Sequence, residues 1–170
     1  MNATANVLTV DDDPIIRADL RLVLEDAGFS VCPDARDGAE AVELAREHEP
    51  DVILLDLGLP GVDGVEATRR ILAERSVPIV ALTGGSRDHV ERAVEAGVTS
   101  YVLKPFGKGE VVRALHDALA THATAAMSAA RVASREALAE LVSMFGYPDE
   151  WADELEARAY AQGRVWRRTR

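Results

Sequence analysis

Short apolar runs alternate with amphipathic helical segments along the first 121 residues, and this alternation constrains the fold most strongly. Five runs rich in β-type residues are each followed by apolar residues at helical spacing. The predicted strands occupy residues 7–10, 30–32, 52–55, 78–82 and 100–103. The last three helices are predicted over residues 65–74, 87–96 and 108–121. Five consecutive βα units predict an α/β fold, a doubly wound five-stranded parallel sheet with helices on both faces.

Charge and composition change near residue 121. The whole net charge of −10 lies before this point, because residues 122–170 hold seven acidic and seven basic side chains. An acidic surface repels phosphate backbones, so nucleic-acid binding is not expected of the chain as a whole. The change predicts a folded domain over residues 1–121 and a two-helix C-terminal extension over 134–170. Residues 122–133 are alanine-rich, and they either form a helical linker or continue the fifth helix.

The sequence lacks a membrane span, a signal peptide and a second cysteine, and these features bear on where the protein is located and whether it can form a disulfide. No apolar run approaches the length of a membrane span, and the first residues lack the basic and apolar parts of a signal peptide. Cys32 is the only cysteine, which excludes a disulfide within the chain. We therefore expect a cytoplasmic protein that makes no contact with membranes.

Four of the five predicted strands end in polar side chains. These side chains are Asp11, Asp12, Asp13, Asp56, Thr83 and Lys104. The carboxyl ends of parallel strands open onto one crevice, so we expect these groups to meet at one edge of the sheet. Turns also favour aspartate, and for Asp13 and Asp63 a role in a turn explains the residue as well as a role in the site does.

Several carboxylates at one edge repel one another and require a cation. Hard oxygen ligands suit Mg²⁺ or Mn²⁺, and no His or Cys accompanies them, so zinc is not expected. A carboxylate such as Asp56 can attack phosphorus and form an acyl phosphate. Lys104 is then placed to pair with a phosphate oxygen, and the Thr83 hydroxyl to donate to another. The pattern indicates phosphoryl transfer.

Four segments in order resemble the receiver domain of the response-regulator family. They are residues 7–14, 55–64, 81–84 and 101–106, which read VLTVDDDP, LDLGLPGVDG, ALTG and YVLKPF. The resemblance covers about two-thirds of the chain. It implies a flavodoxin-like sheet with strand order 2-1-3-4-5 and a part in two-component signal transduction.

The resemblance also implies a role for each matching residue. Asp56 would be the phosphoacceptor, phosphorylated by a partner sensor histidine kinase. The metal would be held by the side chains of Asp12 and Asp56 and by the backbone carbonyl of Gly58, and Asp11 would help to hold it through water. The chain would catalyse its own phosphorylation and dephosphorylation without being an enzyme for another substrate.

The remaining implied roles concern the switch. Thr83 and Tyr101 match the pair that moves on phosphorylation, Lys104 matches the phosphate-binding lysine, and the peptide bond before Pro105 is expected to be cis. The family's output face corresponds to residues 87–96, Tyr101 and residues 108–121. We expect this face, or the C-terminal helices, to form a homodimer or to dock a partner.

Apolar stripes of the C-terminal part are consistent with such docking, because they need a cover. They consist of Leu138, Leu141, Phe145, Trp151 and Leu155.

Two alternative functions stay open from the sequence. Residues 90–97 resemble regulators that carry an ANTAR RNA-binding domain, which suggests a transcriptional or antitermination regulator that binds RNA or DNA through a degenerate C-terminal region. The other alternative is an aspartate-nucleophile phosphatase of the HAD class, for which Asp11 and Asp13 have the required spacing. The set of Asp56, Thr83 and Lys104 favours the receiver domain over this enzyme.

Glycines stand at two positions near the predicted phosphate. Gly58 and Gly85 each lie two residues after a predicted site residue, where many relatives of the receiver family carry larger side chains. We hypothesise that water therefore reaches the acyl phosphate easily and that it is short-lived. The alternative is that both glycines serve loop geometry alone.

Overall fold

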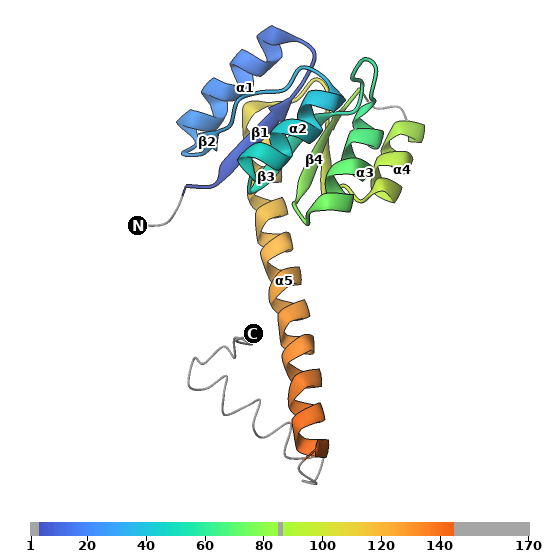
Figure 1. The fold of residues 1–170 in the computed structure, drawn as a ribbon. Coiled ribbons are helices and arrows are strands. Elements are labelled where there is room, and N and C mark those ends of the chain that lie inside the picture. Colours follow the sequence, from blue (N-terminus) through green and yellow to red (C-terminus); the bar gives the residue numbers. More distant parts are fainter. Residues whose placement is uncertain (1–3, 85–86, 145–170) are drawn as a thin grey trace. The chain divides into compact units, whose positions relative to one another are not determined.

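Residues 4–84 and 87–144 are described by the computed structural model, which contains a single five-stranded sheet in this part of the chain (Figure 1). The strands are β1 (Asn6–Val10), β2 (Ser30–Val31), β3 (Val52–Asp56), β4 (Ile79–Thr83) and β5 (Ser100–Leu103). Their order is β2-β1-β3-β4-β5, and every neighbouring pair is parallel. The predicted doubly wound, flavodoxin-like fold is confirmed.

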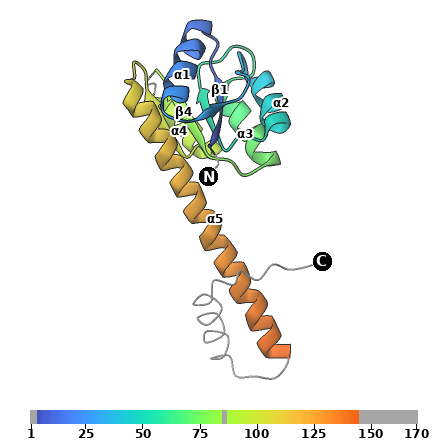
Figure 2. The ribbon, with the colours of Figure 1, turned by 90° about the vertical axis from the view of Figure 1, so that its left-hand side faces the viewer.

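Helices cover both faces of this sheet (Figure 2). They are α1 (Pro14–Asp26), α2 (Gly38–His48), α3 (Gly64–Glu74), α4 (Arg87–Ala96) and α5 (Lys108–Met144). One core joins the sheet to α2, α3 and α4, and the other joins it to α1 and α5. None of the described helices has the length and apolar character needed to cross a membrane.

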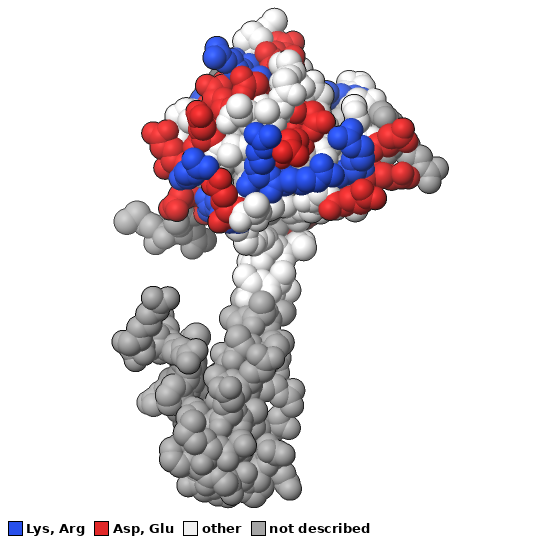
Figure 3. All heavy atoms as spheres, turned by 45° about the vertical axis from the view of Figure 1, so that its right-hand side comes forward, with Lys and Arg blue, Asp and Glu red and all other residues white. Residues whose placement is uncertain are grey.

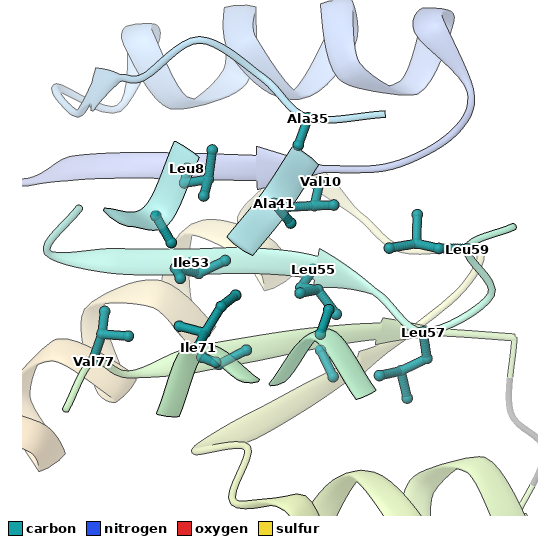
Figure 4. Packing of buried hydrophobic residues seen from close by; sticks show 14 of the residues in the cluster. Leu8, Val10, Ala35, Ala41, Ile53, Leu55, Leu57, Leu59, Ile71 and Val77 are labelled. Carbon is teal, nitrogen blue, oxygen red and sulfur yellow. The ribbon is translucent and has the colours of Figure 1, made fainter. Parts of the chain in front are cut away.

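Successive residues of the central strands point into opposite cores. In β3, Ile53 and Leu55 belong to the core beneath α2 and α3, where they pack with Ile71 of α3 (Figure 4). Val52 and Leu54 belong to the core beneath α1 and α5. A strand buried on both faces needs apolar residues at every position. This explains why the strand is a continuous apolar run and why it could be recognised in the sequence.

Aspartates begin the first three helices. The side chains of Asp13, Asp37 and Asp63 accept hydrogen bonds from backbone N–H groups two or three residues later, at the starts of α1, α2 and α3. Glu40, three residues after the cap Asp37, is placed as in a capping box but differs in one respect. The Glu40 carboxylate accepts from the N–H of Arg36, at 2.9 Å, and this donor lies one residue before the cap.

The fifth helix is longer than predicted. It runs without a break from Lys108 to Met144, so it does not end near residue 121, and residues 122–133 continue it. Helix-forming residues dominate this segment, and no Gly or Pro interrupts it after Gly109. The chain divides into two compact units, residues 1–122 and 123–170, and α5 contributes to both. The second of the two helices predicted over residues 134–170 lies outside the described residues.

A charged cluster ties α1 to the segment after β2. The Asp34 carboxylate accepts from Nε of Arg17 at 2.5 Å and from Nη2 of Arg21 at 2.9 Å. The same Arg21 nitrogen donates to the carbonyl of Cys32 at 3.0 Å. Burial raises the pKa of the Asp34 carboxyl, but the hydrogen bonds from Arg21 and Arg17 outweigh it, so this pKa lies below its ordinary value of 3.8.

We predict that the contribution of Asp34 to stability disappears in acid. A depressed carboxyl pKa contributes stability above the pKa of the unfolded chain, and that stability is lost as pH falls through the lower folded value. Asp34→Asn is therefore expected to lower the free energy of unfolding by about 1 kcal/mol at neutral pH. The gap between the variant and wild type should narrow below pH 3.8, the ordinary value.

Urea denaturation across this pH range measures both quantities. Asp19→Asn, at an exposed position on α1, is the matched control and should show neither effect. A gap for Asp34→Asn that is the same at every pH would contradict the assigned ion pairs.

Candidate functional site

Four strand ends deliver polar side chains to one edge of the sheet. Asp11 directly follows β1 and is fully buried, Asp56 ends β3 and is 6% exposed, and Thr83 ends β4 and is 1% exposed. Lys104 directly follows β5. The structure thus brings together side chains that the sequence placed at a common edge.

Sheet register sets Asp11 beside Asp56. Strands β1 and β3 are neighbours, and Val10 pairs with Leu55, so the residues that follow them come side by side. Burying two carboxylates without compensation is costly, because charge is poorly stabilised away from water. Their side chains therefore need a cationic partner in the folded protein.

Lys104 provides that partner. Its Nζ lies 2.8 Å from Oδ2 of Asp11 and 3.0 Å from Oδ2 of Asp56. Burial lowers the pKa of the Lys104 ammonium, but the hydrogen bonds to the two carboxylates raise this pKa by more than burial lowers it. The pKa of Lys104 therefore lies above its ordinary value. The lysine therefore remains charged at neutral pH and bridges two strands that lie next to each other.

The carboxylates form a candidate metal site. Asp11, Asp12 and Asp56, here called the acidic site, each offer one oxygen, and these oxygens lie within 4.8 Å of one another. Three carboxylates against one ammonium leave an excess of negative charge. A hard divalent cation with oxygen ligands fits both the donor set and this charge.

Glycines shape the loop after Asp56. Gly58 donates its N–H to Oδ1 of Asp56 at 3.1 Å. A Cβ on Gly58 would lie 3.7 and 3.8 Å from the two Asp56 carboxylate oxygens, at ordinary contact distance. A Cβ on Gly64, in contrast, would lie 2.3 Å from the backbone oxygen of Asp56, which is too close. Gly64 is thus required for close packing, whereas Gly58 leaves open space above the carboxylate. Gly85 lies outside the described residues.

The residues of the predicted switch pair lie in different surroundings. Thr83 is buried at the end of β4, whose Leu82 pairs with Asp56. Tyr101 lies on β5 and is 48% exposed, so it does not join the buried part of the site. The peptide bond between Lys104 and Pro105 is cis, as expected.

Two aspartates for which the sequence left a site role open are the N-caps of helices α1 and α3. Asp13 caps α1 through Oδ1, which accepts from Ile15 N at 2.8 Å. Asp63 caps α3 and pairs with Arg92 of α4 at 3.2 Å. The turn interpretation left open for both residues accounts for these contacts.

Sequence reasoning missed Arg17. Its Nη1 donates to the backbone carbonyl of Asp11 at 2.7 Å, and no motif pointed to it. The available signal was a pair of arginines, Arg17 and Arg21, four residues apart on a helix that also buries Leu20 and Leu24. Such spacing places both on one helix face beside the core.

Comparison with known proteins agrees with this geometry. Residues 7–116 match the response regulator receiver domain. The transcriptional regulatory protein PdtaR of Mycobacterium tuberculosis is 43% identical over 110 residues, which are 64% of this chain and 54% of that protein. The chemotaxis protein CheY of Halobacterium salinarum is 38% identical over 115 residues, which are 66% of this chain and 95% of that protein.

A solved structure extends the comparison to three dimensions. The receiver domain of the sensor histidine kinase PA1611 from Pseudomonas aeruginosa PAO1, with a magnesium ion coordinated in its active site cleft, is 35% identical to this chain. It aligns with a TM-score of 0.64 over 69% of this chain and 99% of that one. The chain spans about half the length of PdtaR. Since the matched segment, residues 7–116, makes up more than half of the 170 residues, the chain belongs to the response regulator receiver domain family.

Proposed function

We propose that the chain is a cytoplasmic two-component response regulator that accepts a phosphoryl group on Asp56 from a sensor histidine kinase. The observation that carries this proposal is the Lys104 ammonium, which contacts both Asp11 and Asp56 at the sheet edge. A charged lysine within 3.0 Å of a carboxylate oxygen is well placed to bind a phosphoryl group attached to that carboxylate.

Mg²⁺ or Mn²⁺ is the proposed cofactor. The side chains of Asp11, Asp12 and Asp56 would hold it together with the carbonyl of Gly58. When bound, such an ion neutralises charge on the phosphoryl oxygens. The magnesium ion in the related PA1611 receiver domain supports this assignment.

The chemistry that we assign to the chain is a displacement at phosphorus. A carboxylate oxygen of Asp56 forms a bond to the phosphorus of a phosphohistidine, and the P–N bond breaks with its electron pair staying on the imidazole. Lys104 pairs with a phosphoryl oxygen, and Thr83, buried at the end of the neighbouring strand, donates its hydroxyl to another. Attack of water on the acyl phosphate later regenerates Asp56, so the chain turns over its own phosphate without acting on another substrate.

Removal of the nucleophile tests this function. We expect Asp56→Asn to lower incorporation of phosphate from phosphoramidate by at least about 100-fold, because an amide oxygen is a far weaker nucleophile than a carboxylate. Intact-protein mass spectrometry in the presence of Mg²⁺ measures the incorporated phosphate.

Asp13→Asn is the matched control for this measurement. Asn caps a helix as well as Asp does, and Asp13 engages the N–H of Ile15, so this variant should accept phosphate like wild type. Undiminished phosphorylation of a folded Asp56→Asn variant would refute the proposed phosphoacceptor.

Access of water is proposed to limit the lifetime of the phosphate. No side chain at position 58 covers the Asp56 carboxylate, and a Cβ there would lie 3.7 Å from its Oδ1. We expect Gly58→Asn to slow the loss of phosphate several-fold, since its side chain would exclude water from the phosphorus. The phosphate remaining over time after removal of the donor gives the rate.

Gly109→Ala serves as the control, because a Cβ at this position on α5 meets nothing within 4 Å. It should leave the rate unchanged. Equal rates for Gly58→Asn and wild type would indicate that Gly58 serves loop geometry alone.

Output is proposed to pass through the face formed by α4, β5 and α5. This face exposes Tyr101 and Leu103, which are 48% and 51% accessible, beside a hollow of about 540 Å³ that also includes Arg113 and Asp117 of α5. Exposed apolar side chains beside charged ones suit a protein interface. We propose that phosphorylation switches this face and the C-terminal helices for dimerisation or partner docking.

Nucleic-acid binding is the second candidate function. It is favoured by relatives such as the transcriptional regulatory protein PdtaR, whose match to this chain covers 54% of that protein. The net charge of −10 opposes it, and acidic and basic side chains lie interspersed on the face seen in Figure 3.

Light scattering of the full chain separates the two functions. We expect beryllofluoride with Mg²⁺ to change the apparent mass, because this complex mimics the phosphoryl group, and we expect Asp56→Asn to abolish the change. Constant mass together with salt-dependent binding of RNA or DNA would favour the second function.

A further inference from the structure

The backbone of Asp11 is held on both sides by one set of contacts. Its N–H donates to the carbonyl of Ala35 at 3.1 Å, and its carbonyl accepts from Nη1 of Arg17 at 2.7 Å. Nε of the same arginine donates to Asp34, the residue before Ala35, at 2.5 Å. The Asp11 backbone is therefore held by three residues, here called the bracket: Arg17, Asp34 and Ala35.

This bracket fixes a peptide group between two residues of the acidic site. The carbonyl of Asp11 belongs to the peptide unit that leads into Asp12, and a peptide unit is planar. Holding its oxygen therefore restricts rotation of the whole unit. Asp12 itself is exposed, so the direction of its carboxylate depends strongly on the backbone that presents it.

The Asp11 side chain extends from the backbone that Arg17 and Ala35 hold, and Asp13 and Lys104 contact its two oxygens. Its Oδ1 accepts from the N–H of Asp13 at 2.9 Å, and its Oδ2 accepts from Lys104 at 2.8 Å. Both contacts depend on where the strand end lies. A shift of the Asp11 carbonyl would therefore displace the carboxylates of Asp11 and Asp12 relative to that of Asp56.

We propose that Arg17 is a positioning residue, which fixes the Asp11–Asp12 peptide and thereby raises the affinity of the acidic site for a divalent cation. The proposal rests on the metal-binding function assigned above to Asp11, Asp12 and Asp56. Arg17 does not touch the cation in this scheme, and it acts through the peptide that it holds.

Electrostatics alone predicts the opposite effect of removing Arg17. The guanidinium is a positive charge near a cation site, so its loss would strengthen cation binding if charge were the dominant effect. Loss of a group that orients metal ligands instead weakens metal affinity about 10- to 100-fold. The sign of the change therefore distinguishes positioning from simple charge.

The experiment is a titration of the full chain with Mn²⁺, with free Mn²⁺ measured by electron paramagnetic resonance. We expect Arg17→Met to weaken Mn²⁺ binding about tenfold. Arg21→Met is the matched control, because Arg21 also binds Asp34 but its guanidinium donates to the Cys32 carbonyl, whereas Arg17 donates to the Asp11 carbonyl. It should change the affinity less than about twofold. Urea denaturation of both variants shows whether a change in Mn²⁺ affinity follows from a change in the free energy of unfolding.

A second variant keeps the proposal testable if Arg17→Met fails to fold. Arg17→Lys keeps the positive charge, but its single ammonium cannot reproduce the two separate contacts of Nε with Asp34 and of Nη1 with the Asp11 carbonyl. It should therefore weaken Mn²⁺ binding in the same direction by a smaller factor, and unchanged or tighter binding by this variant would count against the positioning role. Unchanged or tighter binding by folded Arg17→Met, or equal weakening in Arg17→Met and Arg21→Met, would overturn the positioning role. Failure of wild type to bind Mn²⁺ would instead refute the proposed metal site.

Discussion

The contact of one ammonium with two buried carboxylates is the constraint on which the rest of this site depends. Lys104, which follows the edge strand β5, reaches Asp11, which follows β1, and Asp56, which ends β3; both of these strands lie nearer the middle of the sheet. Without that cation, β1 and β3 would bring two carboxylates together away from water. The strand order, the register and the charge of Lys104 must therefore be compatible with one another, so that the two buried carboxylates are compensated. The same requirement places a buried carboxylate, an ammonium group and a buried hydroxyl at one sheet edge.

Much of this arrangement could be predicted because the signals are local and periodic. Strand β3 is buried on both faces, so four apolar residues in a row before Asp56 identified both the strand and the residue at its end. Polar residues at the ends of parallel strands must meet, which located Asp11, Thr83 and Lys104 without any contact being known. The described structure brings these three strand ends and Asp56 to one edge of the sheet.

The remaining features depend on distances that no pattern encodes. Helical spacing places Arg17 and Arg21 on one face of α1, but nothing in the spacing indicates that Asp34 lies between them or that Arg17 reaches the Asp11 carbonyl. The length of α5 is not fixed by the sequence pattern for a different reason. The change of charge and composition near residue 121 left two alternatives for residues 122–133, a linker or a continuation of the helix. An alanine-rich segment without Gly or Pro favours the continuation, which runs on to Met144.

Two glycines near Asp56 have different effects: Gly64 allows close packing against the Asp56 backbone, and Gly58 leaves the Asp56 carboxylate accessible. At Gly64 an added Cβ would meet the Asp56 backbone at 2.3 Å, so the start of α3 can lie against the strand end only because that atom is absent. At Gly58 an added Cβ would merely touch the carboxylate. The backbone beneath the Asp56 carboxylate is therefore closely packed, while the space above that carboxylate is open. In the function proposed above, this rigid base would position the carboxylate, and the open side would admit the phosphoryl donor and later the water that removes the phosphate.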